Sequence, residues 1–238
     1  MNLSDETGQQ QNGNPEIVPE QSWDLALEAT GAMGRLGPVR LKLYSRQIED
    51  VNSSILFSRA VDDDGGISIL EGPGNIDQAV SYGVDVSGTL PTADLGIPGG
   101  KLDWSASVRD SEIEDPSTGL DRNLSGTRHA AYSLNFRQDL LGTPWAWGLG
   151  YDTNRSAPGF GVTQQTYRWD SAGHAGVFVQ HKDIAGMSGR LSISNLTDVN
   201  ERFMRVGHAG TVTDPVDFIE DRTRRQGLHV GFNLSGSF

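Results

Sequence analysis

The final stretch of the chain, GLHVGFNLSGSF at positions 227–238, alternates apolar and polar residues. The even positions carry Leu228, Val230, Phe232, Leu234, Gly236 and Phe238. Strict period-2 alternation predicts a β-strand with one apolar and one wet face. A strand in a soluble sandwich is usually only about 5–6 residues long, whereas a tilted strand that crosses a bilayer needs roughly 9–11. The stretch therefore predicts a membrane-crossing strand that ends on an aromatic residue.

The same alternation recurs through most of the chain, with every charged residue of the regular segments on the polar face. The regular segments are 22–33, 38–47, 79–90, 101–109, 129–137 and 145–153, and two less regular ones lie near 174–182 and 189–206. A soluble β-sandwich shows the same periodicity, because its apolar face is the core. Periodicity alone therefore leaves open whether lipid or a protein core covers the apolar face.

The lengths of the connections favour a membrane barrel. Short connections at 34–38, 91–100, 138–144 and 183–188 alternate with longer polar ones at 48–78, 110–127, 154–165 and 207–217. Outer-membrane barrels have short periplasmic turns, longer extracellular loops and aromatic girdles. Nine aromatic residues share the apolar face, many near strand ends: Trp23, Tyr82, Trp104, Tyr132, Phe136, Trp145, Trp147, Tyr151 and Phe238. We predict an all-β, antiparallel transmembrane β-barrel of the outer-membrane type.

The composition limits the partners and the chemistry. The formal net charge of −12 argues against nucleic acid, which requires a Lys/Arg excess, and the absence of cysteine excludes thiolate chemistry. The first fifteen residues have neither the basic nor the apolar region of a secretion signal. The segments expected to be strands number nine. This is an odd number, whereas single-chain bacterial barrels have an even number of strands. We therefore expect a partial barrel from a longer protein.

Four segments, in order, resemble TonB-dependent receptors. They are GNPEIVPEQSWDLALE at 13–28, AVSYGVDV at 79–86, DPSTGLDR at 115–122 and NLTD at 195–198. The first is similar to a segment before a mid-barrel strand, and the second to a barrel strand that more often has Glu where Asp85 stands. The third resembles an extracellular loop of the family, and the fourth the turn before the last hairpin. The closing segment resembles the family's assembly signal, carried by Phe232, Leu234 and Phe238.

The resemblance implies a receptor with an N-terminal TonB box, a plug domain and a 22-stranded barrel that imports ferric siderophores, cobalamin, carbohydrates or other scarce nutrients. Residues 1–21 would be an extracellular loop segment and residues 22–238 the C-terminal portion of the barrel, with the plug absent. The implied location is the bacterial outer membrane. The implied partners are membrane lipid and lipopolysaccharide, the barrel-assembly machinery through the terminal strand, and TonB only through the missing plug. No cofactor and no enzymatic activity are implied.

Five basic residues on the polar face are expected to point into the lumen: Arg40, Lys42, Arg46, Lys101 and Arg109. As part of a transport path they would face the ligand. Their alternative role is cross-strand pairing with carboxylates, for which Asp24, Glu28, Asp85 and Asp103 are available. The sequence does not identify the residues that bind a substrate.

The remaining clusters each have a functional and a structural interpretation. The acidic run 62–66 (DDDGG) suits a hard cation, but solvated loops are commonly acidic. The five histidines show no ligand spacing. Arg222, Arg224 and Arg225 either hold an anionic ligand or pair with lumen charges or lipopolysaccharide phosphates.

Two other functional classes stay open. The first is a complete small barrel of eight or ten strands, acting as a pore or as a structural protein of the outer membrane. The second is a barrel enzyme such as a lipase or protease. No G-x-S-x-G motif supports a hydrolase, and neither Gly-x-Gly piece of the chain opens a helix as a dinucleotide site requires.

Overall fold

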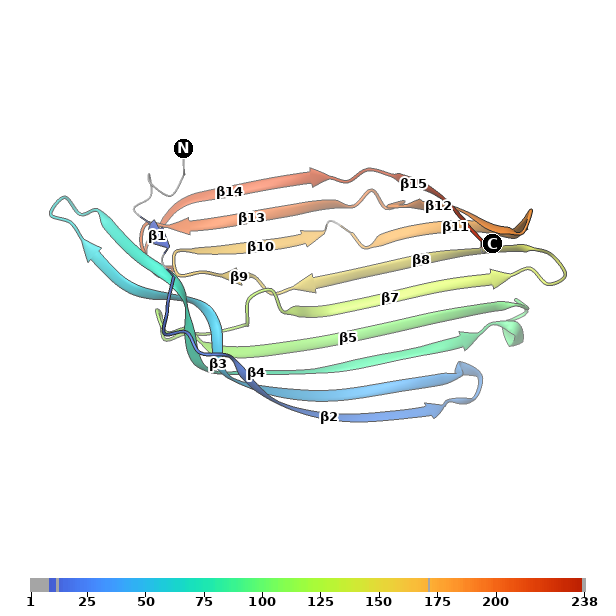
Figure 1. Cartoon of the computed structure of the whole chain (residues 1–238), viewed down its shortest axis with the longest axis horizontal. Helices are drawn as coiled ribbons and strands as arrows, with labels where there is room; N and C mark the ends of the chain where they lie inside the picture. Colours follow the sequence, from blue (N-terminus) through green and yellow to red (C-terminus); the bar gives the residue numbers. More distant parts are fainter. Residues whose placement is uncertain (1–8, 12, 171, 237–238) are drawn as a thin grey trace.

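The computed structural model describes residues 9–11, 13–170 and 172–236, and it consists of β-strands and short 3-10 turns (Figure 1). Nine strands form the main path of one antiparallel sheet, in the order β15-β12-β11-β8-β7-β5-β4-β3-β2. Their bounds are β2 Gln21–Ala32, β3 Pro38–Val61, β4 Ile67–Pro91, β5 Gly100–Glu114, β7 Arg128–Asp139, β8 Trp145–Ser156, β11 His174–Ile184, β12 Met187–Ser194 and β15 His229–Ser235. This confirms the expected antiparallel array, in which seven strands have 11 to 25 residues, whereas β12 has 8 and β15, within the predicted strand 227–238, has 7.

Two minor strands and a second sheet are added to this array. β1 (Gln9–Gln11) pairs in parallel with β4, and β6 (Asp121–Arg122) pairs with β5. The second sheet has the order β14-β13-β10-β9 and consists of β9 (Gly159–Phe160), β10 (Gln164–Asp170), β13 (Asn200–His208) and β14 (Val216–Arg225). In the chain, β10 leads into β11, β12 into β13, and β14 into β15. The second sheet therefore continues three strands of the first beyond a break.

The NLTD segment forms the break between β12 and β13. Asn195 and Asp198 both have positive φ angles, of 59° and 48°, a conformation that Asn and Asp tolerate. The Asn195 amide donates to the carbonyl oxygen of Gly227 at 2.6 Å, and its Oδ1 accepts from the Val199 amide at 2.8 Å. One side chain therefore joins the breaks in two neighbouring strands. The segment precedes the β13–β14 hairpin, as the resemblance implied.

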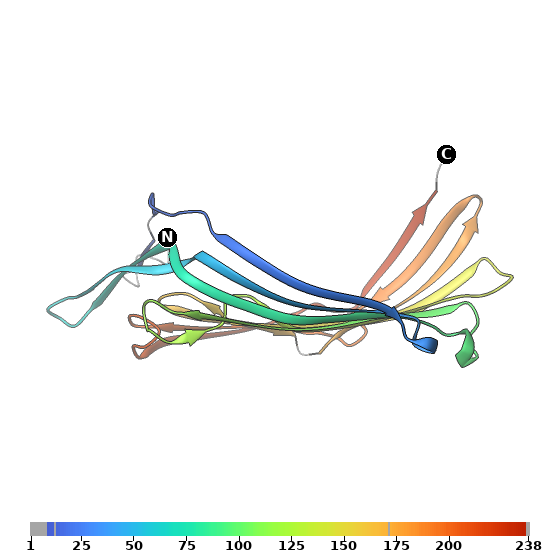
Figure 2. The same cartoon turned by 90° about the horizontal axis from the view of Figure 1, so that it is seen from below.

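The apolar face of the sheet is uncovered. The exposed fractions of Trp23, Leu25 and Phe232 are 73%, 75% and 68%. Within the described residues the sheet is a single curved layer with no second layer on it (Figure 2). A soluble sandwich buries this face against a partner sheet about 10 Å away, and soluble monomers rarely expose apolar patches larger than a few hundred Å². The fold therefore supports lipid over a protein core as the medium of this face.

The connections lie at two opposite ends of the sheet (Figure 1). We call one the turn end, where the chain reverses at 33–37, 92–99, 140–144 and 185–186. At the other, the loop end, the strands are joined by 62–66, 115–127, 157–163 and 209–215. Short and long connections alternate as expected, with one exception.

The exception is the segment 48–78, predicted as a loop, which is a projecting hairpin. β3 runs on to Val61, and β4 begins at Ile67, so only the acidic turn 62–66 joins them. Asp50 has a positive φ of 55° and lacks a ladder partner, and a register shift falls between Leu56 and Ser58. The bulge at this shift moves the side chains that follow it to the other face, so the alternation is not continuous.

β10, within a stretch where no strand was predicted, is the second correction. It is polar on one face and lies between a tight turn and the break before β11. Likewise, the single irregular strand expected at 189–206 is two strands, β12 and β13, separated by the break.

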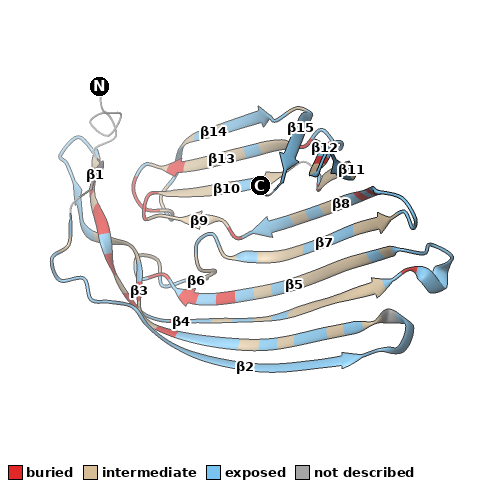
Figure 3. Ribbon diagram, turned by 45° about the vertical axis from the view of Figure 1, so that its right-hand side comes forward, coloured by how far each residue is buried: buried red, intermediate tan, exposed pale blue. Residues whose placement is uncertain are grey.

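Most of the buried residues of the described part of the chain lie at the loop end (Figure 3). One apolar cluster is made of Ile48, Val51, Ile76, Ala79 and Ile113, with Ile55 and Leu124 packed against it. This cluster fixes the base of the projecting hairpin against β5 and the loop that follows it. The loop end is thus a packed structure in its own right, whereas the strands are held mainly by their ladders.

Both edges of the sheet are open. Every residue of β2 and every residue of β15 is exposed, and within the described residues neither strand has a ladder partner on its outer side. The array is thus a curved segment of a barrel and is not closed on itself. Among the described residues, no helix has the length and apolarity to cross a membrane.

Candidate functional site

The polar face carries the five basic residues singled out in the sequence, and three of them pair with carboxylates of neighbouring strands. Arg40 Nη2 lies 2.6 Å from Glu28 Oε2, and Arg109 Nη2 lies 3.2 Å from Asp85 Oδ1. Arg46 forms a two-pronged pair with Asp24, its direct partner in the β2–β3 register. These contacts fix the side chains across the strands, which is the alternative role the sequence offered.

The other two basic residues lie differently. Lys101 pairs with Asp103 of its own strand at 2.9 Å, two residues along on the same face. Lys42 has no ion pair among the described residues, and its Nζ lies 5.7 Å from the centre of the Tyr44 ring. Arg109 approaches the same ring at 5.7 Å. Tyr44 therefore holds two cations beside its π-face.

Lys42, Tyr44 and Arg109 line a basic hollow of about 570 Å³ on the polar face of β2–β5. Its charged lining consists of four cations and two carboxylates: Lys42, Arg46, Arg109, Arg128, Asp24 and Asp85. The hollow has an excess of two positive charges, while the whole chain has a formal charge of −12. It would therefore attract an anionic group that enters along the polar face.

A second hollow, of about 540 Å³, lies on the polar face of β7–β12 and is built around an aromatic ring. Phe178 lies between two arginines, with Arg190 3.7 Å and Arg137 5.8 Å from the ring centre. Gly148 makes this possible, because a Cβ there would meet Phe178 Cε1 at 2.5 Å. Arg137 of β7 also donates to Gln180 of β11 at 2.9 Å. This hydrogen bond joins two strands that lie on either side of β8 in the sheet.

The histidines show no arrangement for a metal. His174 Nε2 lies 3.1 Å from Asp170 Oδ2, and His229 Nε2 lies 3.1 Å from the carbonyl oxygen of Gln226. Within the described ranges, no group of three or more potential ligands is close enough together to hold a metal ion. The acidic run 62–66 forms the tip of the projecting hairpin, where the Gly65 amide donates to the Asp62 carbonyl at 2.9 Å.

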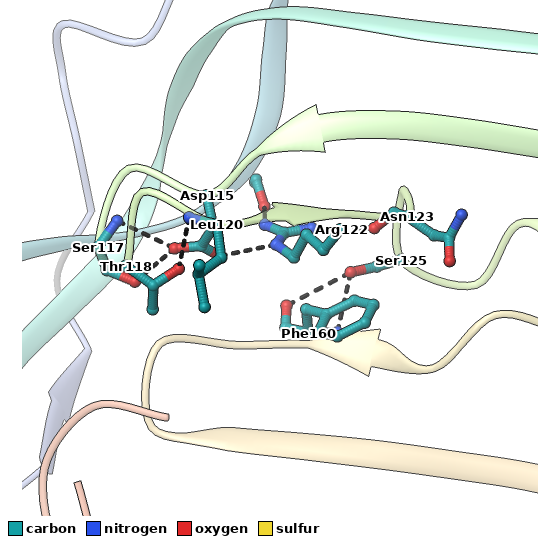
Figure 4. A network of polar contacts seen from close by, with 9 residues as sticks. Asp115, Ser117, Thr118, Leu120, Arg122, Asn123, Ser125 and Phe160 are labelled. Carbon is teal, nitrogen blue, oxygen red and sulfur yellow. Dashed lines mark hydrogen bonds and ion pairs between the residues drawn. The ribbon is translucent and has the colours of Figure 1, made fainter. Parts of the chain in front are cut away.

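The loop that follows β5 is organised by a buried ion pair (Figure 4). Arg122 Nε lies 2.6 Å from Asp115 Oδ2, and each side chain is only 10% exposed. The Ser117 amide donates to Asp115 Oδ1 at 2.9 Å. Burial raises the pKa of Asp115, but the hydrogen bonds from Ser117 and Arg122 outweigh it and leave that pKa below its usual value. Asp115 is therefore held as a carboxylate.

The connections of the loop end contact one another in a ring. Arg122 lies 5.1 Å from the Phe160 ring centre, and Ser125 Oγ accepts from the Phe160 amide at 2.9 Å. The next link is the Val212 amide, which donates to the Val162 carbonyl at 2.9 Å. The ring is completed where the 209–215 loop reaches the projecting hairpin, through Arg59 and Asp214 at 2.8 Å.

The three arginines of β14 do not form one cluster. Arg222 pairs with Glu220 at 2.8 Å and lies 4.7 Å from the Phe203 ring centre. Arg168 approaches the same ring at 5.2 Å. Arg224 and Arg225 are exposed. Of the three residues that the resemblance predicted to carry an assembly signal, Phe232 and Leu234 lie exposed on β15, and Phe238 lies outside the described residues.

Sequence reasoning missed two features of this site, the Asp115–Arg122 pair and the ring of Phe178 between two arginines. Asp-Pro-Ser-Thr-Gly at 115–119 is typical of a turn, and this was the one available indication that Asp115 organises its loop. Nothing local indicated Phe178, because its arginine partners come from other strands. Both features depend on the strand register.

The fold defines the chain as a partial antiparallel β-barrel of the outer-membrane type. It is similar to the siderophore receptor PirA from Acinetobacter baumannii, with a TM-score of 0.52 and 15% identity over 79% of this chain and 29% of that one. It is also similar to a double variant of the ferric enterobactin receptor PfeA from Pseudomonas aeruginosa, with a TM-score of 0.58 and 14% identity over 93% of this chain and 32% of that one. No protein-family model and no curated protein matches the sequence.

The fold is thus that of part of the β-barrel of these two receptors. The chain spans about a third of the length of the two receptors, 29% and 32%. What those receptors bind is a property of the whole proteins.

Proposed function

We propose that the chain is the C-terminal part of the barrel of a TonB-dependent outer-membrane receptor that takes up a scarce nutrient. The observation that carries the proposal is the uncovered apolar face of a nine-stranded antiparallel array, whose opposite, polar face is lined by ion pairs. Lipid on one face and a polar lumen on the other satisfy both surfaces. The likeness to two siderophore receptors supports the same reading.

The roles of the parts follow from this arrangement. Residues 22–238 would form barrel wall and residues 1–21 an extracellular segment, with the loop end outside the cell and the turn end in the periplasm. The packed ring of loops would meet the ligand first. The basic hollow beside Lys42 and Arg109 would then face the path through the lumen, where an anionic nutrient such as a ferric siderophore is favoured over neutral carbohydrate.

The partners of the receptor would be those of its class. TonB would act through a plug domain, the assembly machinery would engage the terminal strand, and lipopolysaccharide would surround the outer face. Transport, and no catalysis, is the proposed activity. The open edges at β2 and β15 favour a larger barrel over a small closed pore, because an unpaired edge in a membrane is costly.

An uptake experiment tests the proposal. The reading frame that encodes this chain is deleted, and cells are given a panel of radiolabelled nutrients, namely ferric siderophores, cobalamin and oligosaccharides. We expect uptake of one compound to be lost, to return on complementation, and to stop when a protonophore removes the proton gradient. Uptake of every compound unchanged by the deletion would contradict the proposal. Uptake that persists with the protonophore would indicate a passive pore.

A further inference from the structure

The negative charge of the chain is concentrated at the loop end of β3, β4 and β5. The projecting hairpin, residues 48–78, has seven carboxylates and one cation, and the segment 110–127 has five carboxylates and one cation. Their net charges of −6 and −4 account for −10 of the formal −12 of the chain. A surface of this charge attracts cationic partners.

The projecting hairpin turns away from β5 at the loop end, and a hollow of about 670 Å³ lies between them (Figure 3). We call it the acidic hollow, because its charged lining consists of four carboxylates and no cation: Asp77, Glu112, Glu114 and Asp121. All four residues are exposed, and none has an ion pair among the described residues. In the basic hollow, by contrast, both carboxylates are paired with arginines.

Three of these carboxylates share one face of the β5–β6 ladder. Glu112 and Glu114 alternate with the buried residues Ser111 and Ile113, so they lie on the same side of β5. Asp121 is the direct ladder partner of Glu114. Like charges directly opposite each other destabilise a sheet, and real proteins keep such conflicts mainly at functional sites. The arrangement therefore indicates a cation that comes from outside the chain.

The spacing of the row suits an extended chain. Residues two apart on a strand are separated by about 6–7 Å, and the side chains on one face of an extended peptide repeat at the same distance. The carboxylates of Glu112 and Glu114 are thus spread along the strand and do not surround one point. They match a peptide that has a cation at every second residue.

The edge of β4 that borders the hollow is unpaired. On the side away from β3, β1 ends opposite Glu71, and β5 begins opposite Ala79. Among the described residues, 72–78 therefore have a ladder partner only on the β3 side. Pro73 has no N–H to donate, so a strand added here would pair with residues 75–78. The same four residues line the acidic hollow.

The structure already contains a strand added to this edge of β4. β1 pairs in parallel with residues 69–71, immediately before the unpaired stretch. The stretch itself is held in place through Asn75, whose Nδ2 donates to the Asp50 carbonyl at 2.6 Å and to the Val18 carbonyl at 3.0 Å. An edge that is fixed in extended form costs less to pair with a partner.

We propose that the acidic hollow binds an extended cationic segment of a partner protein. The segment adds a strand to residues 75–78 of β4, and its Lys or Arg side chains on one face reach Glu112, Glu114 and Asp121. The backbone pairing selects an extended chain, and the carboxylates select its charge. This surface is separate from the polar face that the proposed function assigns to the nutrient.

Fluorescence anisotropy with the complete 238-residue chain in mild detergent tests the site. The labelled probe is a nonapeptide of alternating Lys and Val. In one control peptide every Lys is replaced by Glu, and in the other every Val is replaced by Pro, which cannot donate to a ladder. We expect saturable binding of the Lys–Val peptide and much weaker binding of both controls.

The variant Glu112→Gln/Glu114→Gln should raise the Kd of the Lys–Val peptide about tenfold, because two exposed ion pairs are lost. It should fold at least as well as the natural chain, since it removes the opposed like charges. The matched control is Asp62→Asn/Asp63→Asn, which removes the same charge from the exposed tip of the same hairpin and should leave the Kd nearly unchanged. An equal loss in both variants would show a general attraction to acidic surface and overturns the site.

Hydrogen exchange of the natural chain locates the bound peptide without any variant. We expect the Lys–Val peptide to protect the amides of residues 75–78. Protection confined to β2 or β15, whose edges are also open, overturns the site, and so does displacement of the peptide by calcium chloride at equal concentration. Nutrient uptake does not enter these measurements, so their failure leaves the proposed function standing, and a failed uptake experiment leaves the site standing.

Discussion

Arg59 Nη2 lies 2.8 Å from Asp214 Oδ1, although the two residues are 155 positions apart. Arg59 belongs to the projecting β3–β4 hairpin and Asp214 to the loop before β14. The Thr211 amide also donates to Asp214, at 2.7 Å, and this bond together with the nearby Arg59 charge keeps the pKa of Asp214 below its usual value. Near the same contact, a Cβ on Gly210 would lie 3.3 Å from Cγ2 of Ile67, so the loop passes close to the hairpin. The loop end is therefore closed on itself by a contact between its most distant parts.

The substitution Arg59→Ala should loosen the hairpin without unfolding the wall. Because the pair is partly exposed, its contribution to stability is small. We expect faster hydrogen exchange at residues 60–68 and 209–215, with the melting temperature nearly unchanged. Arg40→Ala, which removes a pair near the turn end, is the control and should leave those two segments unchanged. Equal exchange in both variants would show that the Arg59–Asp214 contact does not hold the hairpin.

Loss of Arg122 should have a much larger effect on its loop. Arg122→Ala leaves the Asp115 carboxylate buried without its cation, which typically costs about 3–5 kcal/mol. We expect residues 115–127 to become sensitive to protease while the strands stay folded. The double variant Asp115→Asn/Arg122→Leu should recover much of the protection, because no uncompensated charge remains. A protected loop in Arg122→Ala would contradict the role given to the pair.

The same pair predicts an acid-sensitive loop. The pKa of Asp115 is lower in the folded loop than in the unfolded chain. Its contribution to stability is therefore fully present above the ordinary carboxyl pKa of about 3.9, and it is lost as the pH falls through the lowered value. The protection of the amides of residues 115–127, measured relative to the intrinsic exchange rate at each pH, should fall below about pH 4 in the natural chain. In Asp115→Asn the protection should already be lower at neutral pH and should change less with acid.

The strands could be predicted from the sequence because their faces are in different media. Residues such as Leu149 and Tyr151 alternate with Gly150 and Asp152, and this pattern needs no knowledge of the neighbours. The pattern fails beyond Asp50, where the positive φ of this residue and a bulge after Leu56 interrupt the alternation, and in β10, whose apolar residues are too few. The local alternation therefore predicts the strands of the main sheet, but it does not predict the projecting β3–β4 hairpin or β10.

The site was less predictable, because its geometry depends on register. That Arg46 is opposite Asp24 follows from the length of the turn at 33–37, and a shift of one residue would separate them. The contact between Arg59 and Asp214 depends on the path of a hairpin that the sequence does not reveal. The types of residue on the polar face could be read from the sequence, whereas their partners could not.

The open edge at β2 predicts self-association of the isolated chain. Leu25 and Leu27 are 75% and 69% exposed on a strand with an unpaired outer side, which is a template for another strand. We expect mixed oligomers in mild detergent by size-exclusion chromatography with light scattering. The variant Leu25→Lys/Leu27→Lys should increase the monomer fraction several-fold, and Leu41→Lys/Leu43→Lys on the inner neighbour β3 should not. A monodisperse monomer of the natural chain would contradict an open sheet.

Gly148 offers a test of how closely the wall is packed around Phe178. A Cβ at this position would lie 2.3 Å from the Phe136 carbonyl oxygen and 2.5 Å from Phe178 Cε1. The phenyl ring can turn away, but the carbonyl belongs to the ladder between β7 and β8 and cannot move without breaking it. Gly148→Ala should therefore destabilise the wall by about 1–3 kcal/mol, and Phe178→Ala should not rescue it. The control is Gly31→Ala, since Gly31 has no heavy atom within 4 Å of its Cβ position and should change the melting temperature little. Rescue by Phe178→Ala would instead show that the aromatic ring, and not the neighbouring strand, sets the requirement for glycine.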